Sequence, residues 1–219
     1  MTIVTALSLR LQEFKAGYTD GARRLASKFV TLLVKSPVTP NQLTALGFSL
    51  NVVAAVLIWR QIYIAAGVIF LVGSIVDILD GALARLRGQA TPFGAFIDST
   101  TDRISEGFVL GAAALVFASD GPTWGIAAVI AALVTSFLVS YTRAKAEIEG
   151  LDGKAGLMGR AERVVLLGAI LLASPWGVLP YGIALMAALT AFTVVQRSYS
   201  VYRQLQQRDA ASDRGDNIV

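Results

Sequence analysis

Six long apolar segments fill most of the chain between residues 42 and 195, and they limit the folds that it can adopt. A membrane-spanning helix needs about 20 mostly apolar residues. The segments cover residues 42–58, 63–83, 93–118, 123–141, 161–173 and 178–195. Hydrophobic residues make up 55% of the 219 residues and charged residues only 16%, a balance shifted toward membrane proteins. The sequence therefore predicts an all-α integral membrane protein with six transmembrane helices.

The basic residues are distributed asymmetrically over these segments. Lys and Arg concentrate in the cytoplasmic loops of membrane proteins. All but Arg60 of the 19 basic residues lie before the first segment, around the second-to-third and fourth-to-fifth connections, or around and after the end of the sixth. Only an even number of spans places these regions on one side. We therefore expect a multi-pass protein of the cell inner (cytoplasmic) membrane with both termini on the cytoplasmic side.

The two ends of the chain differ from the region between them. Residues 1–35 carry apolar residues at near-helical spacing with basic residues interleaved. This pattern predicts an interfacial amphipathic helix on the cytoplasmic leaflet, with a solvated basic tail as the alternative. Residues 36–206 hold the six helices, and the polar residues 207–219 predict a disordered cytoplasmic tail. The glycine-rich stretch 150–159 follows no strand, so we interpret it as a flexible connector.

The chain contains neither histidine nor cysteine. Their absence excludes disulfides, zinc–thiolate sites, iron–sulfur clusters, histidine metal ligands and Ser-His-Asp catalysis. Any acid–base chemistry must therefore come from carboxylates, Lys, Tyr or bound water.

Five of the 15 acidic residues lie inside the second and third apolar segments: Asp77, Asp80, Asp98, Asp102 and Glu106. A charge at membrane depth costs several kcal/mol, so acids retained there indicate a function. Asp77 and Asp80 are three residues apart and Asp98 and Asp102 are four apart, so each pair shares a helix face. In an antiparallel hairpin, Asp80 meets Asp98 and Asp77 meets Asp102 at matching depths, roughly 6–7 Å and 12 Å below the loop. We expect these four carboxylates to converge near the cytoplasmic boundary.

Four anions this close require counter-charge. Arg85 and Arg103 offer one solution, protonation in a proton or ion pathway offers a second, and bound divalent cations offer a third. A cluster of oxygen ligands without His or Cys suits Mg²⁺, Mn²⁺ or Ca²⁺, and we favour metal binding.

The acids belong to a longer spaced pattern, Asp77-x2-Asp80-Gly81-x2-Ala84-Arg85-x8-Gly94-x3-Asp98-x3-Asp102. All eight fixed positions match the signature of the CDP-alcohol phosphotransferase family, which the chain resembles over most of its length outside the tail. The preceding Thr39-Pro40-Asn41-x2-Thr44 is similar to the start of the first helix in that family. The resemblance implies transfer of a phosphatidyl-type group from a CDP-linked lipid to an alcohol, with release of CMP.

The resemblance also implies roles for these residues. Two divalent ions, Mg²⁺ or Mn²⁺, would bind Asp77, Asp80, Asp98 and Asp102, and Asp102 would also be the base. The cytidine diphosphate part of CDP-diacylglycerol would lie against Gly81, Ala84 and Arg85, with Asn41 and Thr44 nearby. A homodimer is implied as well, and nothing indicates a nucleic-acid partner.

Within the family, the basic residues of the fourth-to-fifth connection resemble those of bacterial phosphatidylinositol phosphate synthases. By this resemblance, the phosphate of inositol 1-phosphate would be bound by Ser140, Arg143, Arg160, Arg163 and Arg197. That subgroup is expected to carry Lys at the position of Arg143. Several cations around one phosphate are physically sensible, because arginine binds phosphate bidentately. The general enrichment of Lys and Arg in cytoplasmic loops is an alternative explanation for the basic residues of this connection.

Other functions fit parts of the sequence. A phosphatidylglycerophosphate synthase of the same family takes glycerol 3-phosphate and also needs a phosphate site, and serine is another acceptor used in the family. A membrane prenyltransferase also holds a diphosphate with Asp motifs and Mg²⁺, but the spacing of Gly81, Arg85 and Gly94 and the short chain argue against it. A proton-coupled transporter predicts acids on several helices, whereas these acids lie on one hairpin.

Overall fold

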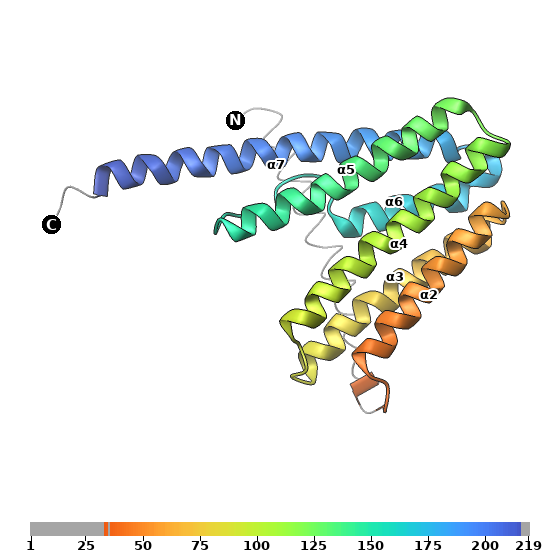
Figure 1. The fold of residues 1–219 in the computed structure, drawn as a ribbon, viewed down its shortest axis with the longest axis horizontal. Coiled ribbons are helices and arrows are strands. Elements are labelled where there is room, and N and C mark those ends of the chain that lie inside the picture. The colour runs from red at the N-terminus through yellow and green to blue at the C-terminus, as the bar shows by residue number, and fades with distance from the viewer. Residues whose placement is uncertain (1–32, 35, 216–219) are drawn as a thin grey trace, which may run out of the picture. The chain divides into compact units, whose positions relative to one another are not determined.

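The computed structural model describes residues 33–34 and 36–215, and this part of the chain is helical without any strand. The amphipathic helix expected over residues 1–35 lies almost entirely outside the described residues. Helices and their short connections follow one another along the chain (Figure 1): α2 (Pro40–Trp59), α3 (Tyr63–Leu86), α4 (Pro92–Ser119), α5 (Thr123–Ile148), α6 (Arg160–Ala173), the 3-10 turn η1 (Ser174–Trp176) and α7 (Leu179–Gly215).

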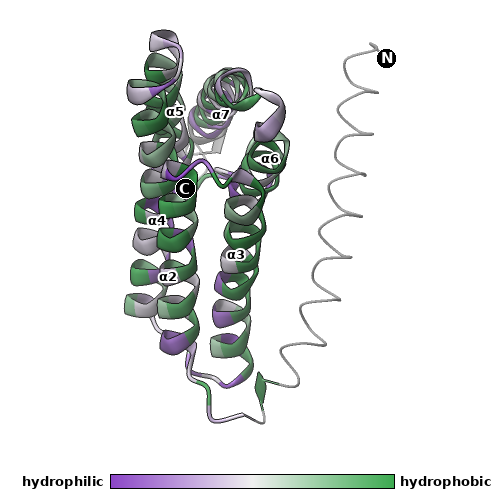
Figure 2. Ribbon diagram, turned by 90° about the vertical axis from the view of Figure 1, so that its right-hand side faces the viewer, coloured by the Kyte–Doolittle hydropathy of each residue, from purple (hydrophilic) through white to green (hydrophobic). Residues whose placement is uncertain are grey.

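Four of these helices are long and apolar enough to cross a membrane: α2, α3, α5 and α7 up to Ala210. In α4, several charged side chains interrupt the apolar sequence, and α6 has only 14 residues. Figure 2 shows hydrophobic residues along most of α2 and α3, with hydrophilic turns toward the carboxyl end of α3. The structure therefore confirms an all-helical fold with several helices of membrane-spanning character.

The chain forms two compact units, which divide three of the helices between them. The first unit joins Met1–Phe48 to Gly73–Thr101, and so contains the start of α2, the end of α3 and the start of α4. Its small core pairs Leu43 with Leu83. Thr39 begins α2 as a capping box, because its hydroxyl accepts from the N–H of Gln42 and the Gln42 amide oxygen accepts from the N–H of Thr39.

The second unit joins Ser49–Val72 to Asp102–Val219 and contains the larger apolar core. Its most deeply buried side chains include Ile58, Leu110, Ile183 and Met186. Helices α5 and α7 lie side by side over a long stretch (Figure 1). A polar contact joins them where the hydroxyls of Thr135 and Thr190 are 2.6 Å apart.

The connection between α5 and α6 differs from the flexible connector that we expected. Residues 151–158, called the strap here, are hydrogen-bonded to side chains of α7. The N–H of Leu157 donates to Gln196, the N–H of Met158 donates to Thr193, and Asp152 exchanges two hydrogen bonds with Gln204. Side chains spaced along one helix thus hold the strap against α7, and glycine content alone did not reveal this.

The carboxyl-terminal region also differs from the expectation. Disorder was predicted from residue 207, but α7 continues to Gly215. The polar composition that favoured a disordered tail is equally compatible with the solvent-exposed end of a long helix, because neighbouring turns supply the backbone hydrogen bonds.

Candidate functional site

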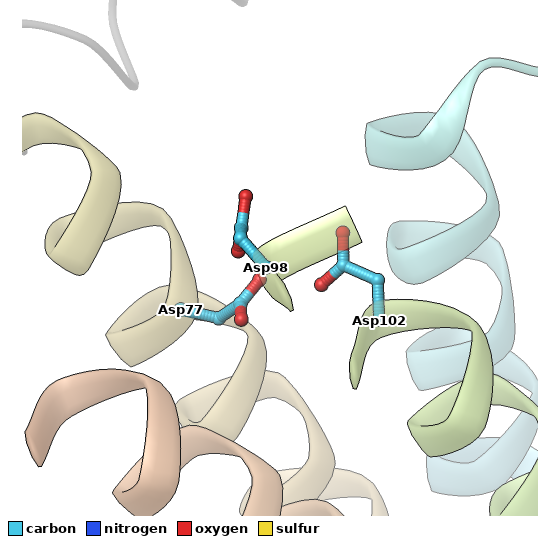
Figure 3. A group of neighbouring side chains, drawn as sticks. All are labelled: Asp77, Asp98 and Asp102. Carbon is cyan, nitrogen blue, oxygen red and sulfur yellow. The ribbon is translucent and has the colours of Figure 1, made fainter. Parts of the chain in front are cut away.

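Three carboxylates from two helices meet near the α3–α4 connection. One oxygen from each of Asp77, Asp98 and Asp102 lies within 4.8 Å of the others. Asp98 and Asp102 are one turn apart on the continuous helix α4, so its geometry places both on the same face. Figure 3 shows the three side chains turned toward one another, Asp77 from α3 and the other two from α4. The hairpin therefore brings three of the four predicted acids together, and Asp80 is not part of this group.

Asp80 lies one turn beyond Asp77 on α3 and is almost completely buried. The hydroxyl of Thr44 on α2 donates a hydrogen bond to its Oδ2. Its other oxygen, Oδ1, is buried without a hydrogen-bond partner in the described part of the chain. Asp80 is also close enough to Asp77 and Asp98 for electrostatic repulsion. An anionic oxygen that is buried without a donor requires compensation, which a cation can supply.

Two glycines explain how α2 comes so close to the acids. A methyl group on Gly47 would lie 3.0 Å from the carbonyl oxygen of Gly73 and 3.4 Å from the Cβ of Asp77. Small residues at a helix crossing permit this close approach. Sequence spacing does not reveal this pair, because small residues are informative only when both helices of a crossing are known.

The residues expected to hold the cytidine diphosphate lie at the ends of these helices. A methyl group on Gly81 would stand 3.4 Å from the Nη1 atom of Arg85, so the guanidinium lies over the bare helix surface at this glycine. Arg85 is exposed, and Ala84 next to it is half-buried. Asn41 is exposed in the first turn of α2. These positions form an accessible surface at the carboxyl end of α3 and, separately, at the start of α2.

Asp102 is held by two arginines in the second unit. The guanidinium of Arg160, at the start of α6, pairs with Asp102 Oδ1, and Arg103 Nη1 lies 3.3 Å from Oδ2. The predicted base is thus beside a predicted phosphate ligand.

Glu106, one turn beyond Asp102, forms the most complete ion pair of this region. The Nε and Nη2 atoms of Arg163 donate to its two carboxylate oxygens at 2.8 and 3.0 Å. Arg163 is buried, with 3% of its surface exposed. The sequence marks Glu106 as an acid at membrane depth but gives it no partner, because only the folded structure pairs residues 57 positions apart.

Arg197 is also buried, near the middle of α7. Its guanidinium donates to the carbonyl oxygen of Ala155 in the strap and to that of Val139 on α5. It is close enough to Arg143 and Arg163 to be repelled by both. Arg143 itself is exposed and paired with Glu147, while Ser140 is half-buried on α5. The second unit therefore gathers most of the predicted phosphate ligands in one region.

The chain is similar to proteins of known family. The family model for CDP-alcohol phosphatidyltransferase matches residues 37–195. An archaetidylinositol phosphate synthase of Pyrococcus horikoshii is 38% identical over 170 residues, which cover 77% of this chain and 86% of that protein. A phosphatidylinositol phosphate synthase of Corynebacterium glutamicum is 38% identical over 183 residues, which cover 80% of this chain and 83% of that protein.

Solved structures give the same result. The Mycobacterium tuberculosis phosphatidylinositol phosphate synthase with CDP-DAG bound matches with a TM-score of 0.73 and 33% identity, covering 82% of this chain and 94% of that chain. The same enzyme in complex with manganese and citrate also matches with a TM-score of 0.73, and the match covers 81% of this chain and 88% of that chain. The range matched by the family model, residues 37–195, includes Asp77, Asp80, Asp98 and Asp102.

Proposed function

The chain belongs to the CDP-alcohol phosphatidyltransferase family, and we propose that it transfers the phosphatidyl group of CDP-diacylglycerol to inositol 1-phosphate. The products are a phosphatidylinositol phosphate and CMP. As a member of this family the protein is a transferase of phospholipid synthesis. The acceptor, the metal site and the roles of single residues are parts of the proposal.

The acidic residues fit a divalent metal site. Their donors are all oxygens, as Mg²⁺ and Mn²⁺ prefer, and the buried Asp80 Oδ1 lacks a hydrogen-bond donor among the described residues. Asp77, Asp80, Asp98 and Asp102 would hold two ions. Bound there, the ions would neutralise the diphosphate of the donor and stabilise the departing CMP. The manganese complex of the mycobacterial relative supports this assignment.

Asp102 is the proposed base, because the chain has no histidine. It would take the proton from the acceptor hydroxyl, whose oxygen then bonds to the phosphorus that carries diacylglycerol. The diphosphate bond to this phosphorus breaks, and CMP leaves with the bridging oxygen. Arg160, which pairs with Asp102, would instead bind the phosphate of the acceptor when that substrate arrives. Acceptor binding would thereby free the base.

The observation that carries the choice of a phosphorylated acceptor is the group of cations in the second unit. Arg197 is repelled by Arg143 and Arg163, and Arg103 is repelled by Arg160 and Arg163. Guanidinium groups linked by such repulsions are costly to gather unless anions compensate them. Asp102 and Glu106 compensate part of this charge, and a substrate phosphate would compensate more. The names of the corynebacterial and mycobacterial relatives favour inositol phosphate as the source of that phosphate.

We further propose six membrane spans, with α4 and α6 crossing beside the four long apolar helices. The spacing of aromatic residues along two helices supports this topology, because Trp and Tyr favour the membrane interfaces. Trp124 and Tyr141 are 17 residues apart on α5, and Tyr181 and Tyr199 are 18 apart on α7. At 1.5 Å per residue, both separations are about 26 Å, close to the thickness of the bilayer core. The acidic site and both termini would face the cytoplasm. A homodimer remains a prediction, which the mass of the detergent-solubilised protein would test.

A turnover assay tests the proposed reaction. The purified protein is given labelled CDP-diacylglycerol, Mn²⁺ or Mg²⁺, and one acceptor at a time: inositol 1-phosphate, glycerol 3-phosphate, serine or inositol. We expect CMP release with inositol 1-phosphate only. If CMP is released with glycerol 3-phosphate instead, then glycerol 3-phosphate is the acceptor. If no alcohol supports CMP release, the proposed activity is overturned.

Two variants test the acceptor site within the same assay. Arg163→Ala is expected to raise the KM for inositol 1-phosphate with little change in the KM for CDP-diacylglycerol. Lys145→Ala is the matched control, because Lys145 is an exposed cation of the same region, paired with Glu149. Equal KM values for the two variants would remove Arg163 from the acceptor site.

A further inference from the structure

One arginine outside the family motif makes an unusual set of contacts. The guanidinium of Arg87, just after the end of α3, donates to four main-chain carbonyl oxygens of the segment that precedes α2. Nη1 donates to Val38 at 2.6 Å, and Nη2 reaches Leu33, Ser36 and Val34 at 2.7, 2.7 and 3.0 Å. No carboxylate is needed for these contacts. Arg87 therefore holds the backbone at residues 33–34, 36 and 38.

The backbone of Arg87 is itself held in place. Gly88 adopts a left-handed conformation with φ of 63°. The N–H of Gly88 donates to the carbonyl of Arg85, and the N–H of Gln89 donates to that of Ala84. This is a Schellman motif, which ends α3 and places Arg87 at the C-cap, directly after Leu86. The side chain thus projects from a rigid helix end.

The segment held by Arg87 leads directly into residues proposed to bind the donor. Thr39 follows it and caps α2 together with Gln42. In the next turn, Thr44 donates to the carbonyl of Pro40 and to the carboxylate of Asp80. A shift at the start of α2 would therefore move Thr44 relative to Asp80.

We propose that Arg87 is a positioning residue for the donor site: it ties the start of α2 to the end of α3 so that Thr44 stays against Asp80. This inference rests on the proposed donor roles of Asn41 and Thr44, but not on the identity of the acceptor. Arg87 contacts the segment before α2 and acts on the donor through it. Arginine is required because its planar fork presents five N–H donors, whereas the ammonium of lysine is a compact point charge.

The inference makes a kinetic prediction that a purely structural role does not. Loss of stability lowers the fraction of active enzyme and hence the apparent kcat, but it leaves the KM of the remaining molecules unchanged. Displacement of Thr44 weakens donor binding and raises the KM for CDP-diacylglycerol alone. The KM for the acceptor stays constant.

The experiment compares Arg87→Ala and Arg87→Lys in the full-length protein. For Arg87→Ala we expect the KM for CDP-diacylglycerol to rise about tenfold or more, as the loss of charge-assisted hydrogen bonds implies. In Arg87→Lys the KM for CDP-diacylglycerol should rise less. This variant keeps the test informative if the alanine variant does not fold. The KM for the acceptor should change less than about twofold.

Two controls separate positioning from stability. Val109→Ala removes buried apolar volume from the core of the second unit and should lower the melting temperature without changing either KM. Arg60→Ala removes an exposed arginine that stacks on Trp59. Equal rises in both KM values, or no rise in either for the Arg87 variants, would overturn the proposal.

The test is independent of the proposed acceptor. If another alcohol supports CMP release, the same KM comparison is made with that alcohol. If none does, the proposed function fails, and binding of CDP-diacylglycerol is measured instead by the rise in melting temperature that it causes. The positioning role is supported if CDP-diacylglycerol raises the melting temperature of the wild type more than that of either Arg87 variant. An equal rise in all three proteins refutes it.

Discussion

Arg163 and Glu106 form a bidentate ion pair, with Nε and Nη2 of the arginine 2.8 and 3.0 Å from the two carboxylate oxygens. Glu106 lies one helical turn beyond Asp102 on α4, and Arg163 lies on α6. Both side chains are largely buried. The pairing uses Nε and Nη2 and so fixes the plane of the guanidinium. Glu106 therefore orients an arginine that the acceptor is proposed to contact.

Replacing Glu106 with glutamine should destabilise the protein. The substitution keeps the size of the side chain but leaves the buried charge of Arg163 uncompensated, which costs about 3–5 kcal/mol when one partner of a buried pair is lost. The melting temperature in detergent measures the effect. Glu147→Gln is the control, because its pair with Arg143 is exposed and should contribute less than about 1 kcal/mol. Similar losses in both variants would contradict a special role for Glu106.

Metal binding should depend on Asp80 and on its hydrogen bond from Thr44. Titration with Mn²⁺ is expected to raise the melting temperature of the wild type, and Asp80→Asn should abolish that rise. Thr44→Val keeps the ligands but removes a donor that orients one of them, so the affinity should fall about 10–100-fold. Thr142→Val serves as the control, since this hydroxyl donates to the carbonyls of Leu138 and Val139 in its own helix. An unchanged Mn²⁺ response in Asp80→Asn would remove Asp80 from the metal site.

The strap should be sensitive to a single methyl group at Gly156. This residue has φ of 115°, and an added Cβ would clash with Cγ2 of Thr193. Gly156→Ala is therefore expected to cost about 1–3 kcal/mol and to expose residues 151–158 to proteolysis. Gly150→Ala is the matched comparison, because its φ of 72° is also left-handed but its surroundings are open. Faster cleavage in both variants to the same degree would show that backbone strain, and not contact with α7, holds the strap.

The three tryptophans should report one membrane interface. Trp59 ends α2, Trp124 lies at the start of α5, and Trp176 lies in the turn between α6 and α7. In liposomes, a quencher attached near the lipid headgroup should reduce their fluorescence more than a quencher at the bilayer centre. Ile130→Trp, placed about 10 Å deeper along α5 in a background without the native tryptophans, should reverse this ranking. Stronger quenching of the native tryptophans from the bilayer centre would contradict the proposed topology.

The helices and the acidic group were accessible from the sequence because both follow from local spacing. Apolar length predicted α2, α3 and α5 to within a turn at their amino-terminal ends. The four-residue spacing of Asp98 and Asp102 placed them on one face of α4, and the short connection to α3 brought Asp77 to the same region. Composition was a weaker guide. It predicted a flexible connector and a disordered tail where the structure has the strap and the end of α7.

The sequence by itself determined the class of protein, the carboxylate site and the family, because spacing within a helix and apolar length are properties of neighbouring residues. Only the tertiary structure decided which partner each charge has. It pairs Arg163 with Glu106, Arg160 with Asp102, and Arg87 with the backbone before α2, contacts that join positions about 50 or more residues apart. Such pairings depend on which helix faces meet after folding.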